Sequence, residues 1–320
     1  MSNQSTDHFF KDKVLGHPAG LFVLFFTEMW ERFSYYGMRA ILVIFLTAQL
    51  TDENAGWGWD TTAALSLLGT YALFVYLTPI VGGYLADTKI GYRNAVVIGA
   101  LLMTIGHASM AIETPLFLYI GITFLILGNG FFKPNMTSII SKMYEGRDEK
   151  KDGAYNMFYM GVNAGAFLGI MLCGWVGEKV GWSYGFGLAG IFMFLGMLQF
   201  YFAQPLFGEI GDKPSAEDLA AREAAAIKKV AAGGEGKRNP FLPVDYALIG
   251  IFIVSALIFI INDPLSKIGG IDVLNFTVFG IPDSLFFALL AAITFLLLLF
   301  IRIPRSVSYT HLTLPTTPYV

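Results

Sequence analysis

The chain is 320 residues long, 55% of its residues are hydrophobic and 14% are charged, and its mean hydropathy is +0.59. A soluble protein of this length cannot bury so much apolar surface, so the composition excludes a soluble fold and predicts a membrane protein. The formal net charge of -3 comes without a basic stripe, which argues against nucleic acid as a partner.

Eight apolar segments have the length of about 20 residues that a helix needs to cross the hydrocarbon core of a membrane. In chain order they are 21–50, 62–85, 95–112, 116–140, 154–176, 184–202, 244–261 and 285–301. The first segment is far longer than the apolar region of a signal peptide, so we expect it to remain in the protein. The sequence therefore predicts an all-α membrane protein.

Basic residues between these segments predict how the chain is oriented. Cytoplasmic loops of membrane proteins are rich in lysine and arginine. If the N-terminus is cytoplasmic, only Lys179 and Lys267 lie in loops on the outer side. Four tryptophans then fall at the outer interface, where amphipathic rings prefer to lie: Trp57, Trp59, Trp175 and Trp182. Both patterns predict a multi-pass protein with a cytoplasmic N-terminus.

The spacing of the segments predicts four parts. Residues 1–205 hold six closely spaced spans, and residues 206–243 form a cytoplasmic linker. Within the linker we expect an amphipathic helix over 216–232, because its acidic residues come early and its lysines late. Residues 244–305 hold two additional spans. Residues 306–320 (SVSYTHLTLPTTPYV) lose the apolar pattern, and we interpret them as a non-native tail, with a short natural tail as the alternative.

Charged residues lie inside two of the predicted spans. An ionised side chain at the bilayer centre costs at least about 2.5–3.5 kcal/mol, so such residues normally face a watery cavity and have partners. The first span carries a polar face, and the fourth span carries one lysine: Glu28, Glu31, Arg32, Tyr35, Tyr36 and Arg39 on the first, and Lys133 on the fourth. This pattern predicts a functional cavity between the two spans.

Glu28 and Lys133 lie at a similar depth, roughly 10–12 Å from the cytoplasmic ends of their spans. We therefore expect a Lys–Glu pair across the cavity, which protonation of a glutamate would loosen. Glu28 and Glu31 are three residues apart and repel each other when both are ionised, which favours protonation of one of them. These properties suit a proton-coupling site. The alternative is that the charges only hold the two helices together.

Enzymatic sites find no support in the predicted spans. They contain no pair of histidines, no serine with a base and no pair of aspartates, so we do not expect an intramembrane enzyme. Cys173 is the single cysteine, which excludes an internal disulfide and a thiolate metal site. We expect neither a cofactor nor a metal.

Three segments resemble signatures of one transporter family. The string EMWERFSYYG (28–37) matches the pattern ExxERFxYYG of the proton-dependent oligopeptide transporter (POT) family. The string GNGFFKPN (128–135) resembles that family's lysine segment on the fourth helix, and FYMGVNAG (158–165) resembles its signature on the fifth helix. The turn GGYLADTKIGYR (82–93) resembles the signature between helices two and three of the major facilitator superfamily, to which that family belongs.

The resemblance implies a major facilitator fold, with an N-terminal six-helix bundle followed by an extra helix pair. It implies import of di- and tripeptides with protons, by alternating access across a bacterial inner membrane. The second bundle of that fold is missing from the sequence, so we expect the chain to be truncated and unable to transport by itself. Membrane lipids would surround it, and the oligomeric state stays open.

The resemblance also implies roles for single residues. The proton-coupling cluster would be Glu28, Glu31, Arg32 and Lys133, and the residues that bind the peptide would be Tyr35, Tyr36, Arg39, Tyr71, Lys133 and Asn163. Arg39 and Lys133 would receive the peptide's carboxylate, and Asn163 would hydrogen-bond its backbone. Some relatives have a histidine where this chain has Ala63, so we expect coupling to depend on the carboxylates.

Two alternatives remain open from the sequence. A carrier of drugs or organic anions from the same superfamily would share the topology and the turn at 82–93, but not the three family signatures together. A non-transporting membrane protein derived from half a transporter would share all of them.

Overall fold

A computed structural model of the chain describes residues 13–221, 224, 242–268, 270–271, 273–274 and 276–313. Within these residues every long element is an α-helix, and the strands are two-residue pairs. The chain divides into two compact units, Met1–Ser215 and Ala216–Val320, which are described separately. The predicted all-α membrane fold is confirmed.

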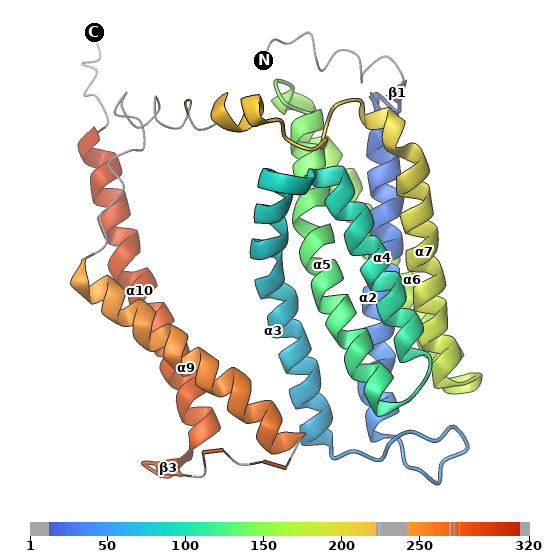
Figure 1. Cartoon of the computed structure of the whole chain (residues 1–320), viewed down its shortest axis with the longest axis vertical. Coiled ribbons are helices and arrows are strands. Elements are labelled where there is room, and N and C mark those ends of the chain that lie inside the picture. Colours follow the sequence, from blue (N-terminus) through green and yellow to red (C-terminus); the bar gives the residue numbers. More distant parts are fainter. Residues whose placement is uncertain are drawn as a thin grey trace. The chain divides into compact units, whose positions relative to one another are not determined.

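The first unit is a bundle of long helices that stand side by side (Figure 1). They are α2 (Ala19–Thr47), α3 (Thr61–Leu85), α4 (Tyr92–Met110), α5 (Pro115–Met143), α6 (Asp148–Lys179) and α7 (Trp182–Ala203). Helix α2 packs against α6 and α7, and α5 packs against α3 and α4. Each predicted span of residues 1–205 therefore corresponds to one helix of this bundle.

Local signals in the sequence determine where several of these helices begin. The carboxylate of Asp60 accepts a hydrogen bond from the amide of Thr62 (2.7 Å) and so caps α3. Helix α5 begins at Pro115, a residue well suited to a first helical position, after the capping residue Thr114. Between α3 and α4, the short helix η1 (Ala86–Ile90) ends at Gly91, whose φ of 82° favours glycine.

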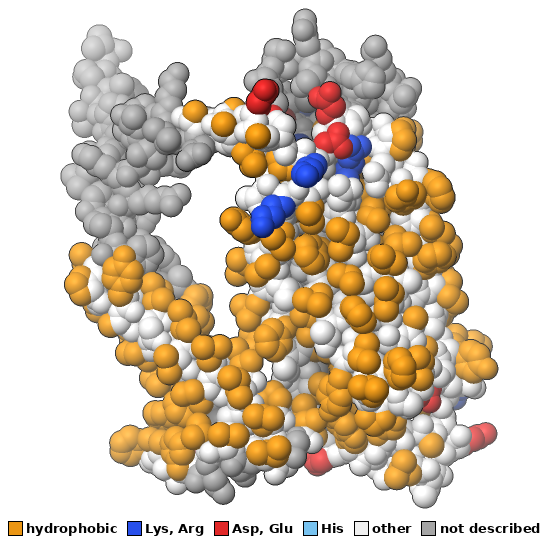
Figure 2. All heavy atoms as spheres, in the orientation of Figure 1, with side chains coloured by type: hydrophobic (Ala, Val, Ile, Leu, Met, Phe, Trp, Pro, Cys, Tyr) orange, Lys and Arg blue, Asp and Glu red, His pale blue; other side chains and the backbone are white. Residues whose placement is uncertain are grey.

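On the face of the bundle that Figure 2 shows, apolar side chains predominate along the helices and charged side chains lie near the ends. Five helices among the described residues combine the length and the apolar composition needed to cross a membrane: Thr61–Ile90, Pro115–Met143, Glu149–Lys179, Trp182–Phe207 and Pro243–Ser266. Helix α2 has the same length as α5 but carries four charged residues in its middle. These charges are the subject of the candidate site.

Glycines let α6 lie directly against α2. A β-carbon added at Gly161 would come within 2.8 Å of the carbonyl oxygen of Phe25. Added β-carbons at Gly165 and Gly169 would overlap carbonyl oxygens in the same way, one and two turns further along α2, at Met29 and Phe33. Small residues at four-residue spacing are a common means of close helix packing in membranes. The two backbones are therefore in contact over three turns, including the part of α2 that carries the charges.

The segment after α7 is tied to the start of α4. The Arg93 side chain forms an ion pair with Asp212 and donates a hydrogen bond to the carbonyl oxygen of Gln204 (3.2 Å). The Arg93 amide donates to the carbonyl oxygen of Gly211 (3.0 Å). The basic residue of the superfamily-like turn thus holds the chain that leaves the bundle, after the short helix η2 (Gln204–Phe207).

A short hairpin precedes the bundle. Strand β1 (Lys13–Val14) pairs with β2 (His17–Pro18), and His17 shares a hydrogen bond with the hydroxyl of Tyr144 (2.7 Å). Partial burial, followed by the nearby charge of Lys150, lowers the pKa of His17 below its ordinary value of 6.5. His17 is therefore held as the neutral imidazole near pH 7.

The second unit contains α9 (Pro243–Lys267) and α10 (Asp283–Thr313), which pack against each other. They are joined through the strand pair β3 (Thr277–Val278) and β4 (Ile281–Pro282). The amide of Asn262 donates to Asp283 (2.7 Å), which links the facing ends of the two helices. These helices correspond to the two additional predicted spans.

Two predictions concern regions that the structure covers incompletely. Residues 216–221 and 224 are helical, and the rest of the amphipathic helix expected over 216–232 lies outside the described residues. Helix α10 continues to Thr313, into the expected tail, whose last residues, 314–320, also lie outside the described part. The interpretation of 306–320 as non-native stays a prediction.

Candidate functional site

A buried cluster of three charges lies in the middle of α2. The Nε atom of Arg32 lies 2.7 Å from Oε1 of Glu28 and 2.9 Å from Oε2 of Glu31. The Glu31 side chain is 0% exposed, and those of Glu28 and Arg32 are 4% and 9% exposed. Glu28 and Arg32 are one turn apart, so the helix itself brings them together. One guanidinium thus neutralises one of two carboxylates that are both removed from water.

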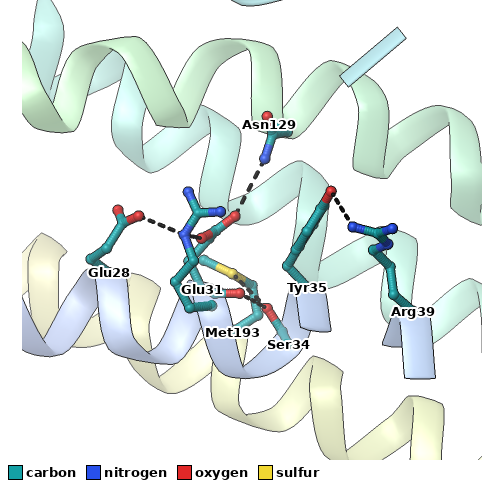
Figure 3. Close-up of polar contacts among 8 residues, drawn as sticks. Glu28, Glu31, Ser34, Tyr35, Arg39, Asn129 and Met193 are labelled. Atoms are coloured by element: carbon teal, nitrogen blue, oxygen red, sulfur yellow. Dashed lines mark hydrogen bonds and ion pairs between the residues drawn. The ribbon is translucent and has the colours of Figure 1, made fainter. Parts of the chain in front are cut away.

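Asn129, which lies on α5, points from that helix toward the cluster on α2 (Figure 3). Its Nδ2 atom donates a hydrogen bond to Oε1 of Glu31 at 3.3 Å. Asn129 is 1% exposed, and its Oδ1 atom has no hydrogen-bond partner. The sequence analysis missed this residue. The signal was an amide side chain between two glycines, Gly128 and Gly130, in an apolar span.

Helix α7 closes the cluster with an apolar wall. The hydroxyl of Ser34 donates to the backbone oxygen of Glu31 (2.8 Å) and contacts the sulfur of Met193 at 3.5 Å (Figure 3). Phe33, one residue earlier, packs on Phe192 with ring centroids 4.2 Å apart. The described contacts between α7 and this part of α2 include no charged side chain. Its polar partners come from α2 and α5.

Tyr35 lies between two arginines, one turn above the cluster. Its hydroxyl accepts a hydrogen bond from Nη1 of Arg39 (3.3 Å), and its ring lies 5.5 Å from the Arg39 guanidinium carbon and 5.7 Å from that of Arg32. The Tyr36 ring is 5.1 Å away and the buried Tyr71 ring of α3 is 6.2 Å away. Cations over aromatic faces gain stabilisation, so Tyr35 holds Arg39 at the site.

Lys133 does not reach the carboxylates in this conformation. Its Nζ atom lies 4.9 Å from the ring centroid of Tyr76 on α3. Within the described part of the chain, Glu28 and Glu31 form ion pairs with Arg32 only. Arg32 lies next to one oxygen of each glutamate from within the same helix. The expected pair of Lys133 with a glutamate therefore stays a prediction.

Asn163 lies apart from these contacts. It is on an exposed face of α6, next to the glycine contacts that bring α6 against α2. The structure thus brings together Glu28, Glu31, Arg32, Tyr35, Tyr36, Arg39 and Tyr71, adds Asn129, and leaves Lys133 and Asn163 without a described bond to them. Among the described residues, no group of three or more metal-binding side chains is present.

Comparison with known proteins places this arrangement in a family. A family profile named PTR2, described as the POT family, matches residues 93–243. The di-/tripeptide transporter of Lactococcus lactis subsp. cremoris is 40% identical over 202 residues, which are 62% of this chain and 41% of the relative. An uncharacterized transporter of Bacillus subtilis, YclF, is 41% identical over 186 residues, which are 58% of this chain and 37% of the relative.

Solved structures agree. A crystal structure of a peptide transporter POT in complex with sulfate has a TM-score of 0.64 and 36% identity, over 82% of this chain and 55% of that one. A crystal structure of a mutant peptide transporter POT has a TM-score of 0.63 and 30% identity, over 98% of this chain and 73% of that one. The chain belongs to the POT family.

Membership of the POT family confirms the resemblance that rested on three short strings. It makes the chain a multi-pass membrane protein of a transporter family, and it separates the chain from carriers that belong to other families of the superfamily. The chain spans about two fifths of the length of the curated POT relatives that it matches, 37% and 41% for the two described above.

Proposed function

We propose that this chain forms the proton-coupling and carboxylate-binding part of a symporter that imports di- and tripeptides across a bacterial inner membrane. The observation that carries the proposal is the buried Glu28–Arg32–Glu31 cluster, in which Glu31 accepts a hydrogen bond from Asn129. The similarity to known proteins also supports the proposal, because a relative with 40% identity is named a di-/tripeptide transporter.

The cluster suits proton binding because its charge is unbalanced. Two carboxylates and one guanidinium sum to a formal charge of -1 (-1 -1 +1). A proton that binds Glu31 makes the group neutral and leaves Arg32 to Glu28 alone. Since a net charge is costly inside a membrane, the neutral group is the one better suited to an occluded state. Lys133, which is placed one turn beyond Asn129 on α5, would be the mobile cation of the site.

Peptide binding would use the arginine and tyrosines above the cluster. Arg39 donates one described hydrogen bond to Tyr35. The remaining N–H groups of its fork-shaped guanidinium suit a carboxylate, which can accept two parallel hydrogen bonds. Tyr36, Tyr71, Lys133 and Asn163 would line the pocket as the resemblance implies. The membrane potential would contribute about 2.3 kcal/mol for each charge moved through 100 mV.

The orientation is part of the proposal. The N-terminus would be cytoplasmic, because the loops that would then be cytoplasmic carry most of the lysines and arginines. Alternating access would open the site to one side of the membrane at a time.

The test is transport by the longest open reading frame that contains residues 1–305, with its product reconstituted in liposomes. A pH gradient should drive accumulation of labelled dialanine, and unlabelled di- and tripeptides should compete. Glu31→Gln should abolish gradient-driven accumulation and retain exchange of peptide for peptide, whereas Arg39→Ala should weaken both. Competition by organic anions without competition by peptides would support the drug or anion carrier instead. Accumulation by Glu31→Gln at the wild-type level would overturn the coupling site.

A further inference from the structure

Helix α5 is fixed tightly to two neighbours at the level of Glu31. A β-carbon added at Gly128 would lie 2.6 Å from the carbonyl oxygen of Gly99 on α4, and one added at Gly130 would lie 2.7 Å from the β-carbon of Thr78 on α3. The Thr78 hydroxyl also donates to a carbonyl oxygen of α5, that of Ile126, at 3.0 Å. The backbone of Asn129 therefore has no room to shift sideways.

The backbone of Asn129 is therefore held in place, and one polar atom of its side chain has no hydrogen-bond partner. Its Nδ2 atom donates to Glu31, and its Oδ1 atom is buried without a hydrogen-bond partner. A buried acceptor without a partner is unfavourable. An amide carries its donors and its acceptor at the two ends of one plane, and the terminal torsion of asparagine is broad and roughly two-fold. A half-turn of the amide would exchange the two ends.

Glu31 changes its hydrogen-bonding character when it binds a proton. The carboxylate only accepts, whereas the carboxylic acid has one O–H that must donate. Its two described partners are Arg32, which has no acceptor, and Asn129, which has one that is unused. Asn129 is thus the described partner able to accept from the acid.

We propose that Asn129 is a positioning residue that follows the protonation state of Glu31. In the ionised state its Nδ2 donates to the carboxylate, and in the protonated state the amide turns over and its Oδ1 accepts from the carboxyl O–H. The proton binds to a Glu31 oxygen, no covalent bond of Asn129 breaks, and the hydrogen bond from Nδ2 is replaced by one to Oδ1. The inference deepens the proposed function, because it concerns the same coupling site, but its test needs no transport.

Other groups also face Glu31, but the described hydrogen bond to its side chain comes from Asn129. On α2 these groups are Arg32 and Glu28, and on α5 the group is Lys133, all of which act on it through their charges. The phenols of Tyr35 and Tyr71 also face it, and α7 contributes no titratable side chain to the described contacts. Arg32, Lys133 and Glu28 carry charges, whereas Asn129 is a neutral amide that has both a donor and an acceptor.

The test is infrared difference spectroscopy of the 320-residue chain in lipid nanodiscs as the pH is changed. The C=O band of the protonated carboxyl is assigned to Glu31 by its loss in Glu31→Gln. In Asn129→Leu, which removes donor and acceptor together, we expect that band to move to higher wavenumber, because the carboxyl has lost its acceptor. The midpoint of the titration should move by less than about one pH unit, because both protonation states lose a hydrogen bond.

Two further variants make the result specific. Asn129→Ser, which keeps a donor and an acceptor, should restore the wild-type band at least in part. Asn135→Leu is the matched control: Asn135 is equally buried on α5 and also has an unpaired Oδ1, but its amide donates to Phe131 of its own helix (2.6 Å). It should leave the Glu31 band in place.

Two results would overturn the inference. If Asn129→Leu leaves the band unmoved, Asn129 does not accept from the acid. If Asn129→Leu raises the midpoint by about one to two pH units, Asn129 serves as a donor to the carboxylate only, since a hydrogen bond to a charged group is worth about 1.5–3 kcal/mol. Failure of peptide uptake in the transport assay would leave both readouts intact, so the two proposals fail separately.

Discussion

Glu31 contacts three polar neighbours in the candidate site. Arg32 reaches it along α2, Asn129 reaches it from α5, and Ser34 bonds to its backbone. Because Arg32 is shared with Glu28, a change at Glu31 alters how that guanidinium is divided between the two carboxylates. The chemistry of the cluster is therefore a property of four side chains together, and substitutions in it are expected to be non-additive.

His17 permits a prediction about pH at the residue scale. Its pKa is lowered by burial and then by Lys150, so the folded state disfavours the imidazolium. The neutral His17 contributes stability that is fully present above the ordinary value of 6.5 and is lost as the pH falls through the lowered pKa. We expect the difference in Tm between wild type and His17→Gln to shrink as the pH falls below about 6.5.

Two measurements check this prediction. The imidazole Cε1–H resonance of His17 should titrate with a midpoint below 6.5, and Lys150→Gln should bring that midpoint closer to 6.5. A stability difference that grows on acidification would contradict it, because it would mean that the fold favours the charged imidazole.

The site was predictable from sequence as far as it depends on one helix. Glu28, Glu31, Arg32, Tyr35, Tyr36 and Arg39 share a face because their spacing follows the helical repeat. Asn129 was missed because its role depends on the rotation of α5 against α2, which no local pattern specifies. The similar depths of Glu28 and Lys133 predicted an ion pair between them. Depth alone could not show that both glutamates pair with Arg32 of their own helix in this conformation.

Contact between α2 and α6 permits a prediction at the element scale. A larger side chain at Gly165 would press on the backbone of Met29. A β-carbon added at Gly165 would also lie 3.0 Å from the β-carbon of Arg32. We expect Gly165→Leu to force the helices apart and to lower the free energy of unfolding by about 1–3 kcal/mol, as overpacking does. Because Arg32 is part of the contact, the variant should also disturb the Glu31 infrared band.

Gly174 supplies the matched control on the same helix. An added β-carbon there meets nothing within 4 Å, so Gly174→Leu should change the unfolding midpoint little. The measurement is thermal unfolding of both variants in the same detergent, followed by circular dichroism. Equal losses for the two variants would show that helix α6 suffers from the larger side chain itself and not from its contact with α2.

The existence of the helices was predictable, and their ends were less so. A span of about 20 apolar residues is a strong signal because lipid leaves the backbone no other partner. Helix α6 begins at Asp148, before the predicted 154, because its polar first turns DEKKDG continue the helix beyond the apolar part. The apolar pattern reports where the membrane-compatible residues are, whereas the helix ends where its hydrogen bonding ends.

The orientation in the membrane permits a prediction for the whole molecule. Glu145 and Glu178 are exposed and lie near opposite ends of α6, which at 32 residues is about 48 Å long. The native Cys173 is buried, so it should give little background with a membrane-impermeant thiol reagent. In sealed right-side-out vesicles, we expect Glu178→Cys to be labelled and Glu145→Cys to be labelled only after permeabilisation.

The same pair of variants contains its own control, since each should be labelled fully in detergent. Labelling of Glu145→Cys in sealed vesicles, with Glu178→Cys protected, would reverse the proposed orientation. It would also place the lysine-rich and arginine-rich loops outside, against the usual distribution of basic residues.

The placement of all three charges of the cluster on one helix has a mechanical consequence. Ion pairs within α2 travel with it, so a displacement of α2 relative to α5 need not tear apart opposite charges in a medium without water, which costs about 3–5 kcal/mol when a partner is lost. Among the hydrogen bonds of the described residues, the one from Asn129 is the bond between α5 and this cluster that has to break. Because its backbone is packed against α6, α2 would move together with α6, and the charges of the cluster would move with their counterions.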